Sequence, residues 1–179
     1  MLRTQRRHRQ PQTDIIALAK TWIRSSTTPA ELIDSTPPGY SLFSAPRSHT
    51  GNPSKLILAG GTAFLIKEPF VQNSAAPHYS SFEYSSITLK FPKAQFTLFN
   101  VYRPPPPSPY SQPFSTILNQ FSSFLFNAAT TPYEFIITGD FNIHVDDLGD
   151  TQTIQFLYLL ASCNLTQHTH SMVTPLISS

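Results

Sequence analysis

The chain has 179 residues, of which 40% are hydrophobic and 12% are charged, and its formal net charge is +2. This length and composition predict one domain with a sizeable core and exclude a disordered polypeptide. No apolar run approaches the roughly 20 residues of a membrane span. The single cysteine, Cys163, excludes an intrachain disulfide and indicates a reducing, intracellular compartment.

The charge is distributed unevenly, because four arginines stand in the first ten residues. The rest of the chain carries eight Lys and Arg against ten Asp and Glu, a net charge of about −2. We therefore predict a basic, disordered tail over residues 1–13 and a folded domain over residues 14–179. The tail lacks the apolar segment of a secretion signal. It can hold nucleic acid through phosphate contacts, or it can be a solvated tail without a partner.

Apolar patterns in the first part of the domain predict short strands separated by turns. Runs of apolar residues predict strands at 14–18 and 40–44. A polar linker over 24–29 separates them. A third strand at 62–67 follows a bend at Gly60-Gly61, where two glycines interrupt the apolar run.

The next segment has the pattern of an antiparallel hairpin. Residues 82–91 alternate between apolar and polar side chains, with one slip at Ser85-Ser86 that indicates a β-bulge. A turn at 92–94 leads into a partner strand at 95–102. The prolines at 104–107 cannot pair in a sheet, so an extended surface loop is expected after the hairpin.

Helical periodicity appears in the last part of the chain. Apolar residues at 3.6 spacing predict a helix over 114–125, with Pro113 at its start. A strand at 135–138 follows, and Asp150 or Thr151 caps a second helix. That helix is predicted to be well buried, with an inert buried thiol at its end, because its apolar residues form a wide stripe: Ile154, Phe156, Leu157, Leu159, Leu160 and Cys163. The order of elements predicts an α+β sandwich of mixed sheets packed with helices.

A carboxylate and a carboxamide follow the strand at 135–138. Asp140 and Asn142 are two residues apart, so they can project together from a strand end. Their oxygens suit a divalent metal and a phosphate. The alternative is an Asx-rich turn in which Gly139 supplies the bend and Asp140 makes local hydrogen bonds.

Four segments follow one another along the chain and carry a family resemblance: DIIALAKTW at 14–22, GGTAFLIK at 60–67, NVYRPP at 100–105 and IITGDFNIH at 136–144. Together they resemble the endonuclease/exonuclease/phosphatase superfamily, and more narrowly the endonuclease domain of LINE-type (non-LTR) retrotransposon polyproteins. The similarity covers about residues 14–178. It implies a four-layered α/β sandwich of two mixed β-sheets flanked by helices. It also implies Mg²⁺-dependent cleavage of phosphodiester bonds in DNA, and through that target a nuclear location.

The resemblance also implies roles for individual residues. Asp140 would orient or deprotonate the attacking water, and Asp140 and Asn142 would hold the metal or the phosphate. Tyr102 would donate a hydrogen bond to a phosphate oxygen, or it would be a half-buried tyrosine at a strand end. Arg103 would steady nearby loops or contact the DNA backbone as a substrate-binding residue. His144 would support substrate binding or belong to a solvated turn.

The chain also departs from the family pattern. Lys20 stands where the family has a metal-binding Glu, and an ammonium group cannot ligate Mg²⁺; without the resemblance, Lys20 would be an ordinary exposed lysine after a strand. Residues 1–13 hold no Asn-bearing strand, and the family's C-terminal Asp and His do not appear before Ser179. We therefore expect a copy truncated at both ends, with an uncovered sheet edge, marginal stability and weak or absent nuclease activity. The alternative function is a non-catalytic remnant that binds nucleic acid weakly through its basic arm.

Overall fold

The computed structural model describes residues 13–24, 26–46, 60–67, 78–106 and 111–167, and the backbone alone of 71–73. The predicted basic arm and the residues after 167 lie outside these ranges. The boundaries of the tail and of the domain therefore stay predictions.

One sheet has three strands, which the sequence predicted to within one residue at each end. Its order is β1-β3-β2, and all its strands pair antiparallel. The strands are β1 (Ile15–Ala19), β2 (Tyr40–Ala45) and β3 (Thr62–Lys67). We call it the small sheet.

A short helix that was not predicted, α1 (Pro29–Asp34), connects β1 and β2. It begins with a capping box, in which the Thr28 side chain accepts from the Glu31 N–H and the Glu31 carboxylate accepts from the Thr28 N–H. The hydrogen bond from the Thr28 N–H lowers the pKa of the Glu31 carboxylate, and so, to a smaller extent, does a second one from the Thr28 hydroxyl. The sequence does contain a helix-start signal here: Thr28 and Pro29 lie at the end of the predicted linker, and Glu31 follows it. Because the helix buries none of its residues, its sequence lacks the apolar periodicity by which the other helices were predicted.

The second sheet has the strand order β4-β5-β6-β7 and is called the large sheet. Here β5 and β6 form the predicted hairpin, while β6 and β7 pair in parallel, so the mixed pairing is found in this sheet. The turn of the hairpin is closed by the Phe91 N–H, which donates to the Ala94 carbonyl at 2.8 Å. The strands are β4 (Val71–Asn73), β5 (Glu83–Lys90), β6 (Gln95–Tyr102) and β7 (Glu134–Asp140).

The predicted bulge at Ser85-Ser86 is wrong, because β5 and β6 pair without interruption along their whole length. The slip in the pattern has another cause, which is that both faces of β5 are buried. Tyr84 packs toward the helices, whereas Ile87 packs toward the small sheet. Between them, the Ser85 hydroxyl accepts a hydrogen bond from Thr62 of the small sheet at 2.9 Å.

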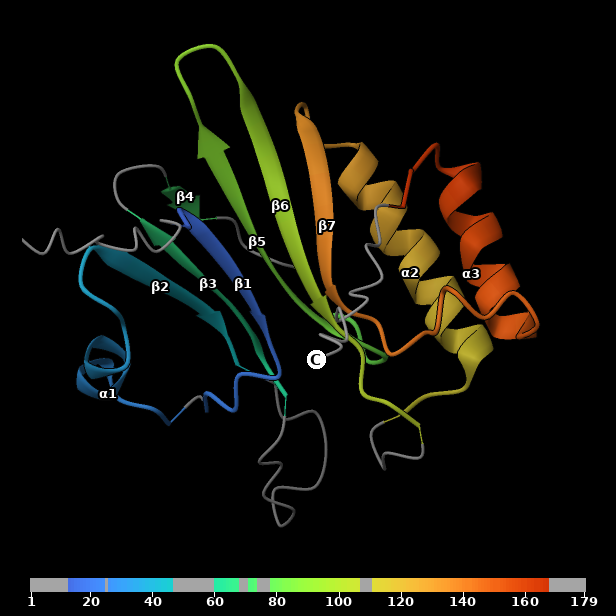
Figure 1. Ribbon diagram of the computed structural model, residues 1–179, viewed down its shortest axis with the longest axis horizontal. Coiled ribbons are helices and arrows are strands. Elements are labelled where there is room, and N and C mark those ends of the chain that lie inside the picture. The colour runs from blue at the N-terminus through green and yellow to red at the C-terminus, as the bar shows by residue number, and fades with distance from the viewer. Residues whose placement is uncertain are drawn as a thin grey trace, which may run out of the picture.

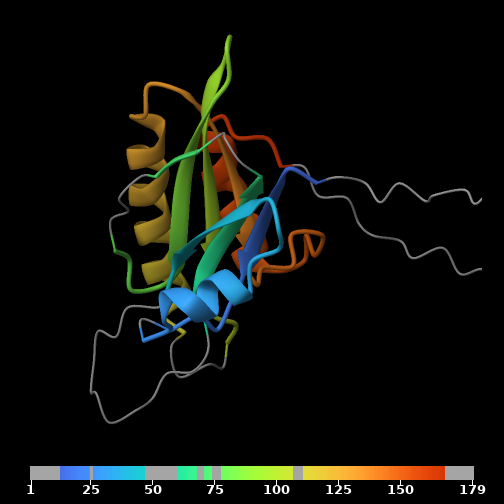
Figure 2. The ribbon, with the colours of Figure 1, turned by 90° about the vertical axis from the view of Figure 1, so that its left-hand side faces the viewer.

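The two sheets pack face to face, and two helices cover the outer face of the large sheet (Figure 1). Seen from the side, α2, the large sheet and the small sheet follow one another as layers (Figure 2). The helices are α2 (Phe114–Ala129), which continues beyond the predicted end, and α3 (Thr151–Ser162), which Asp150 caps. The predicted α+β fold of two sheets with flanking helices is confirmed. None of the described helices has the length and apolar character needed to cross a bilayer.

Separate apolar cores lie on the two faces of the large sheet. The core between the sheets is formed by Phe64, Ile66, Ile87, Leu89 and Leu98. The core under the helices is rich in aromatic rings: Phe82, Tyr84, Phe99, Phe121, Phe124 and Phe156. At the edge strand β7, Ile136 is paired in register with Leu98 and so faces the small sheet, yet it is 55% exposed.

The last helix is less buried than predicted. Of its residues only Thr153 and Phe156 are fully buried, whereas Tyr158 is 72% exposed. Cys163 is exposed, so the prediction of a buried thiol is wrong. The physical reason is that α3 packs on one side only, against α2 and the end of the large sheet, so the width of its apolar stripe exceeds the surface available to bury it.

Candidate functional site

The ends of strands from both sheets meet at one end of the sandwich, the lower end in Figure 1. In the large sheet Glu83, Tyr102 and Asp140 are neighbours in register across β5, β6 and β7. The Glu83 carboxylate accepts a hydrogen bond from the Gly61 N–H at the start of β3. The Gly61 carbonyl in turn accepts from the Thr21 N–H, just after β1, at 3.2 Å. We call this group of strand ends, with the residues that directly follow them, the strand-end site.

A buried asparagine fastens the two sheets together one step inside the site. The Asn100 side chain is fully buried and donates from Nδ2 to the carbonyls of Leu18 at 2.8 Å and Ala63 at 2.9 Å. Two such bonds across the sheets hold the end of β1 against the end of β6. Sequence reasoning placed Asn100 inside a motif but assigned it no function, and it also missed Glu83.

Gly139 allows β7 to continue up to the carboxylate. The predicted strand ended at Thr138 with a bend at Gly139, but β7 runs through to Asp140. Gly139 has a φ of +135°, and a Cβ atom there would lie 1.9 Å from the Val101 carbonyl oxygen. Only glycine permits this close approach of two backbones. Asp140 is thereby brought into register beside Tyr102.

Asp140 and Asn142 form a tight turn whose donor groups are engaged locally. Asp140 is exposed, and its Oδ1 accepts from the Asn142 N–H at 3.1 Å. Asn142 has a φ of +48° and donates from Nδ2 to the Arg103 carbonyl at 2.6 Å. The two side chains do lie together after the strand, and the Asx-type hydrogen bond of the alternative interpretation is present as well.

The buried side chain of Arg103 supports this turn through hydrogen bonds. Its side chain is only 4% exposed, and Nη1 donates to the carbonyls of Phe141 at 3.2 Å and Asn142 at 2.9 Å. The guanidinium lies over the Phe114 ring, and burial lowers its pKa. Nε is buried without a partner. These hydrogen bonds connect Arg103 to the loop after β7, and its predicted contact with the DNA backbone stays a prediction.

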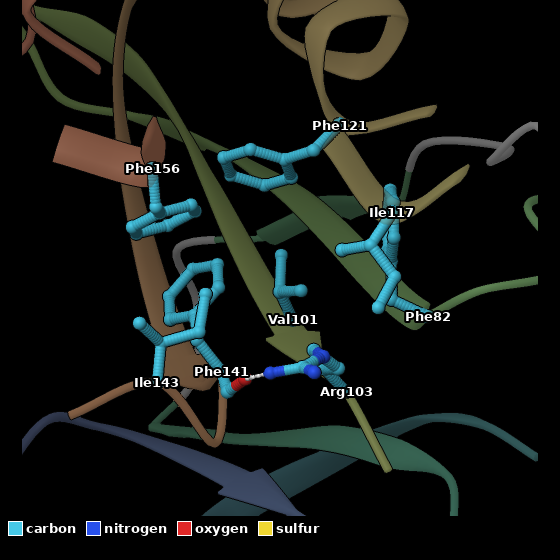
Figure 3. Close-up of a pocket in the computed structure, with 8 residues that line it drawn as sticks. All are labelled: Phe82, Val101, Arg103, Ile117, Phe121, Phe141, Ile143 and Phe156. Atoms are coloured by element: carbon cyan, nitrogen blue, oxygen red, sulfur yellow. Dashed lines mark hydrogen bonds between the residues drawn. The ribbon is translucent and has the colours of Figure 1, made fainter. Parts of the chain in front are cut away.

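Figure 3 shows where the Arg103 guanidinium lies, at the polar end of a small pocket under the helices. The remaining walls are apolar and belong to the aromatic core: Phe82, Val101, Ile117, Phe121, Phe141, Ile143 and Phe156. This pocket lies on the helix face of β6, while Tyr102 and Asp140 are on the face toward the small sheet. The pocket therefore belongs to the packing behind the strand-end site.

The other predicted substrate contacts occupy different environments. Tyr102 is 3% exposed, a buried tyrosine at a strand end. His144 is exposed, and its carbonyl accepts from the Thr153 hydroxyl at 3.0 Å and the Asp147 N–H at 2.9 Å. The backbone of His144 therefore belongs to the turn that begins α3, as the alternative interpretation expected. The contacts of Tyr102 and His144 with substrate stay predictions.

Lys20 and Trp22 border the site from the end of β1. Both have left-handed backbones, with φ values of +56° and +61°. The Trp22 N–H donates to the Gly60 carbonyl at 2.9 Å. The Lys20 ammonium lies 5.8 Å from the centre of the Trp22 ring. The Lys20 side chain is exposed and directly follows β1, which is what the sequence indicated when the resemblance is left aside.

Comparison with known families agrees with this architecture. The model of the endonuclease/exonuclease/phosphatase family matches residues 2–165. This chain belongs to the endonuclease/exonuclease/phosphatase family. The human Nocturnin catalytic domain with bound sulfate anion has a similar structure, with a TM-score of 0.50 and 16% sequence identity, over 86% of this chain. The matched part is 58% of the Nocturnin chain, and identity this low shows the fold alone. A search of curated proteins finds no match.

Members of the endonuclease/exonuclease/phosphatase family generally use divalent metal ions, but the donor groups among the described residues of the strand-end site do not fit one. Among the described residues, no three His, Cys, Asp or Glu side chains are grouped where they could hold a metal ion. Of the two carboxylates in the strand-end site, that of Glu83 is engaged by the Gly61 N–H, which leaves Asp140 as the exposed one. The third strand end contributes the ammonium group of Lys20, which repels a cation. The predicted metal ligands Asp140 and Asn142 are therefore adjacent without further anionic support.

Proposed function

We propose that this chain is a DNA-directed phosphodiesterase domain of the LINE-type retrotransposon endonuclease kind, whose Mg²⁺-dependent cleavage is weak or absent. The observation that carries the proposal is the strand-end site itself. It has Tyr102, Asp140 and Asn142 in one place, with Lys20 at the neighbouring strand end. A nuclear site of action is part of the same proposal, because it depends on the DNA target.

The residues of the site would act by positioning. Asp140 is the exposed acceptor, and its second carboxylate oxygen is available to orient an attacking water. Asn142 is held by the Arg103 carbonyl through Nδ2, which leaves its side-chain oxygen as the acceptor of the amide group. Arg103 keeps this turn rigid from inside the core. This scaffold supports phosphate chemistry, while the missing carboxylate at Lys20 limits the rate.

The second candidate function is a remnant that binds nucleic acid without cutting it. The observation that favours it is Lys20, because a cation at this strand end attracts phosphate while it repels a metal. The proposed basic arm, residues 1–13, would add phosphate contacts. Cleavage and binding can therefore be measured separately.

Nicking of supercoiled plasmid with Mg²⁺ tests the proposal, with wild type compared to Lys20→Glu and Asp140→Ala. We expect little or no nicking by wild type, a gain in Lys20→Glu, and no gain in the double variant Lys20→Glu/Asp140→Ala. Asp146→Ala is the matched control, since Asp146 is exposed in the turn beyond the site. Efficient nicking by wild type that Asp140→Ala abolishes would disprove the loss of activity. Nicking that is equal in wild type and Asp140→Ala would disprove the site.

A further inference from the structure

Trp22 is displayed on the surface although it is the largest apolar side chain available for a core. It is the only tryptophan of the chain and is 54% exposed. It belongs to neither of the two apolar cores. Tryptophan is usually well buried, and an exposed one marks a contact surface more often than a random surface position does.

The backbone that presents Trp22 is strained and held rigidly. Lys20 and Trp22 both adopt left-handed φ values, +56° and +61°. Residues other than glycine meet a steric penalty in this region, because Cβ approaches the following carbonyl oxygen. The turn persists because Gly60 and Gly61 accept hydrogen bonds from Trp22 and Thr21, while the Glu83 carboxylate anchors the Gly61 N–H. Strain maintained in this way is typical of functional sites.

The charge next to the ring points to the chemistry of the ligand. The Lys20 ammonium lies over the Trp22 ring, 5.8 Å from its centre, so a cation and an aromatic ring are presented together at one place on the surface. Proteins bind unpaired nucleotides with this combination, in which the ring stacks on a base and the cation attracts the backbone phosphate. The strand end that carries the pair packs against β7, whose own end is Asp140.

We propose that Lys20 and Trp22 form a nucleotide-binding step at the rim of the strand-end site. The indole stacks on an unpaired base of DNA, and the Lys20 ammonium contacts the adjoining phosphate. The substrate class is then DNA with an unstacked nucleotide beside the phosphodiester that reaches Asp140. The inference rests on the proposed function for this assignment, but the binding itself requires no cleavage.

The single tryptophan makes the step directly observable. Fluorescence of wild type is titrated in EDTA with a short single-stranded oligothymidylate and with an abasic strand of equal length and charge. We expect quenching by the first strand, and binding of the abasic strand that is weaker by roughly fivefold to a hundredfold, the range for loss of a base stack.

Variants assign the effect to the two residues, with affinity read by anisotropy of a labelled strand. Trp22→Leu is expected to bind both strands equally weakly, whereas Trp22→Phe keeps most of the preference for bases. Lys20→Gln should weaken binding of both strands and reduce the salt dependence by about one ion. The controls are Tyr158→Leu, an exposed aromatic residue on α3, and Lys93→Gln in the hairpin turn at the other end of the large sheet. Circular dichroism and urea unfolding verify that all variants fold.

The inference is overturned if wild type shows no quenching, if it binds both strands equally, or if Trp22→Leu binds like wild type. Absence of any binding to DNA also overturns it. Because the titration contains no divalent cation, its result is independent of nicking. Quenching together with efficient nicking by wild type retains the nucleotide-binding step and rejects the proposed loss of activity. Nicking without quenching rejects the nucleotide-binding step.

Discussion

The two strand ends that border the site, those of β1 and β7, have similar backbones and opposite chemistry. Each is followed by a left-handed residue, Lys20 after β1 and Asn142 two residues into the turn after β7. Each turn is fastened by hydrogen bonds to a neighbouring strand end. The carbonyls of Gly60 and Gly61 accept them in the turn after β1, and Arg103 donates two and accepts one in the turn after β7. The first presents a cation beside an aromatic ring, and the second presents a carboxylate beside an amide.

The comparison indicates that the backbone scaffold of a site and its donor groups are separable. Hydrogen bonds between backbone groups, Gly139 and the buried Arg103 hold the strand ends, and none of them uses the side chain of Lys20. We therefore expect a change of charge at Lys20 to alter what the site binds while the fold is kept. Three sets of variants test how far the two ends are alike.

The largest expected effect is at the β7 end. Gly139→Ala places a Cβ 1.9 Å from the Val101 carbonyl oxygen, so we expect loss of about 4 kcal/mol or more in unfolding free energy, or failure to fold. At the β1 end, Gly61→Ala meets the Thr21 hydroxyl at 2.8 Å, which a side-chain rotation relieves, so the loss should be smaller. Gly39→Ala is the control, since its φ is +81° with open space around it. Urea unfolding measures all three, and equal losses would contradict the close approach at Gly139.

An intermediate effect is expected at the fastening of the β7 end. Arg103→Met leaves the Phe141 and Asn142 carbonyls without their charged donor, at a loss of about 2–4 kcal/mol in unfolding free energy. Arg103→Lys should recover part of this loss. Arg24→Met, at an exposed arginine, should change stability little. Denaturant midpoints decide this, and a midpoint for Arg103→Met equal to wild type would mean that the buried guanidinium does not support the turn.

The smallest effects should have opposite signs at the two ends. Lys20→Gly relieves a left-handed backbone and removes the contact of the ammonium with the Trp22 ring, so we expect a net gain of up to about 1 kcal/mol in unfolding free energy. Asn142→Gly relieves a similar backbone but loses the 2.6 Å hydrogen bond to Arg103, so we expect a net loss of about 0.5–1 kcal/mol. Thermal unfolding measures the stability change of both variants. If both changes have the same sign, the proposed difference between the β1 and β7 ends is contradicted.

Local patterns were sufficient for most elements because each is encoded by near neighbours. The hairpin of β5 and β6, the helix α2 and the Asp150 cap of α3 follow from alternation, 3.6 spacing and capping residues. The motif around Asp140 and Asn142 also predicted that both side chains follow one strand end. The false bulge at Ser85-Ser86 arose because alternation assumes one buried face, whereas the large sheet is buried on both.

Residue type and spacing were sufficient to identify the endonuclease/exonuclease/phosphatase family, the α+β class and most of the strands and helices. The directions and contacts of the side chains are set by the packing of the two sheets and the helices. Arg103 turns into the aromatic core, Glu83 reaches across to the small sheet, and Trp22 is left on the surface. These contacts join residues distant in the chain, and their geometry depends on how two sheets pack, which no local pattern contains.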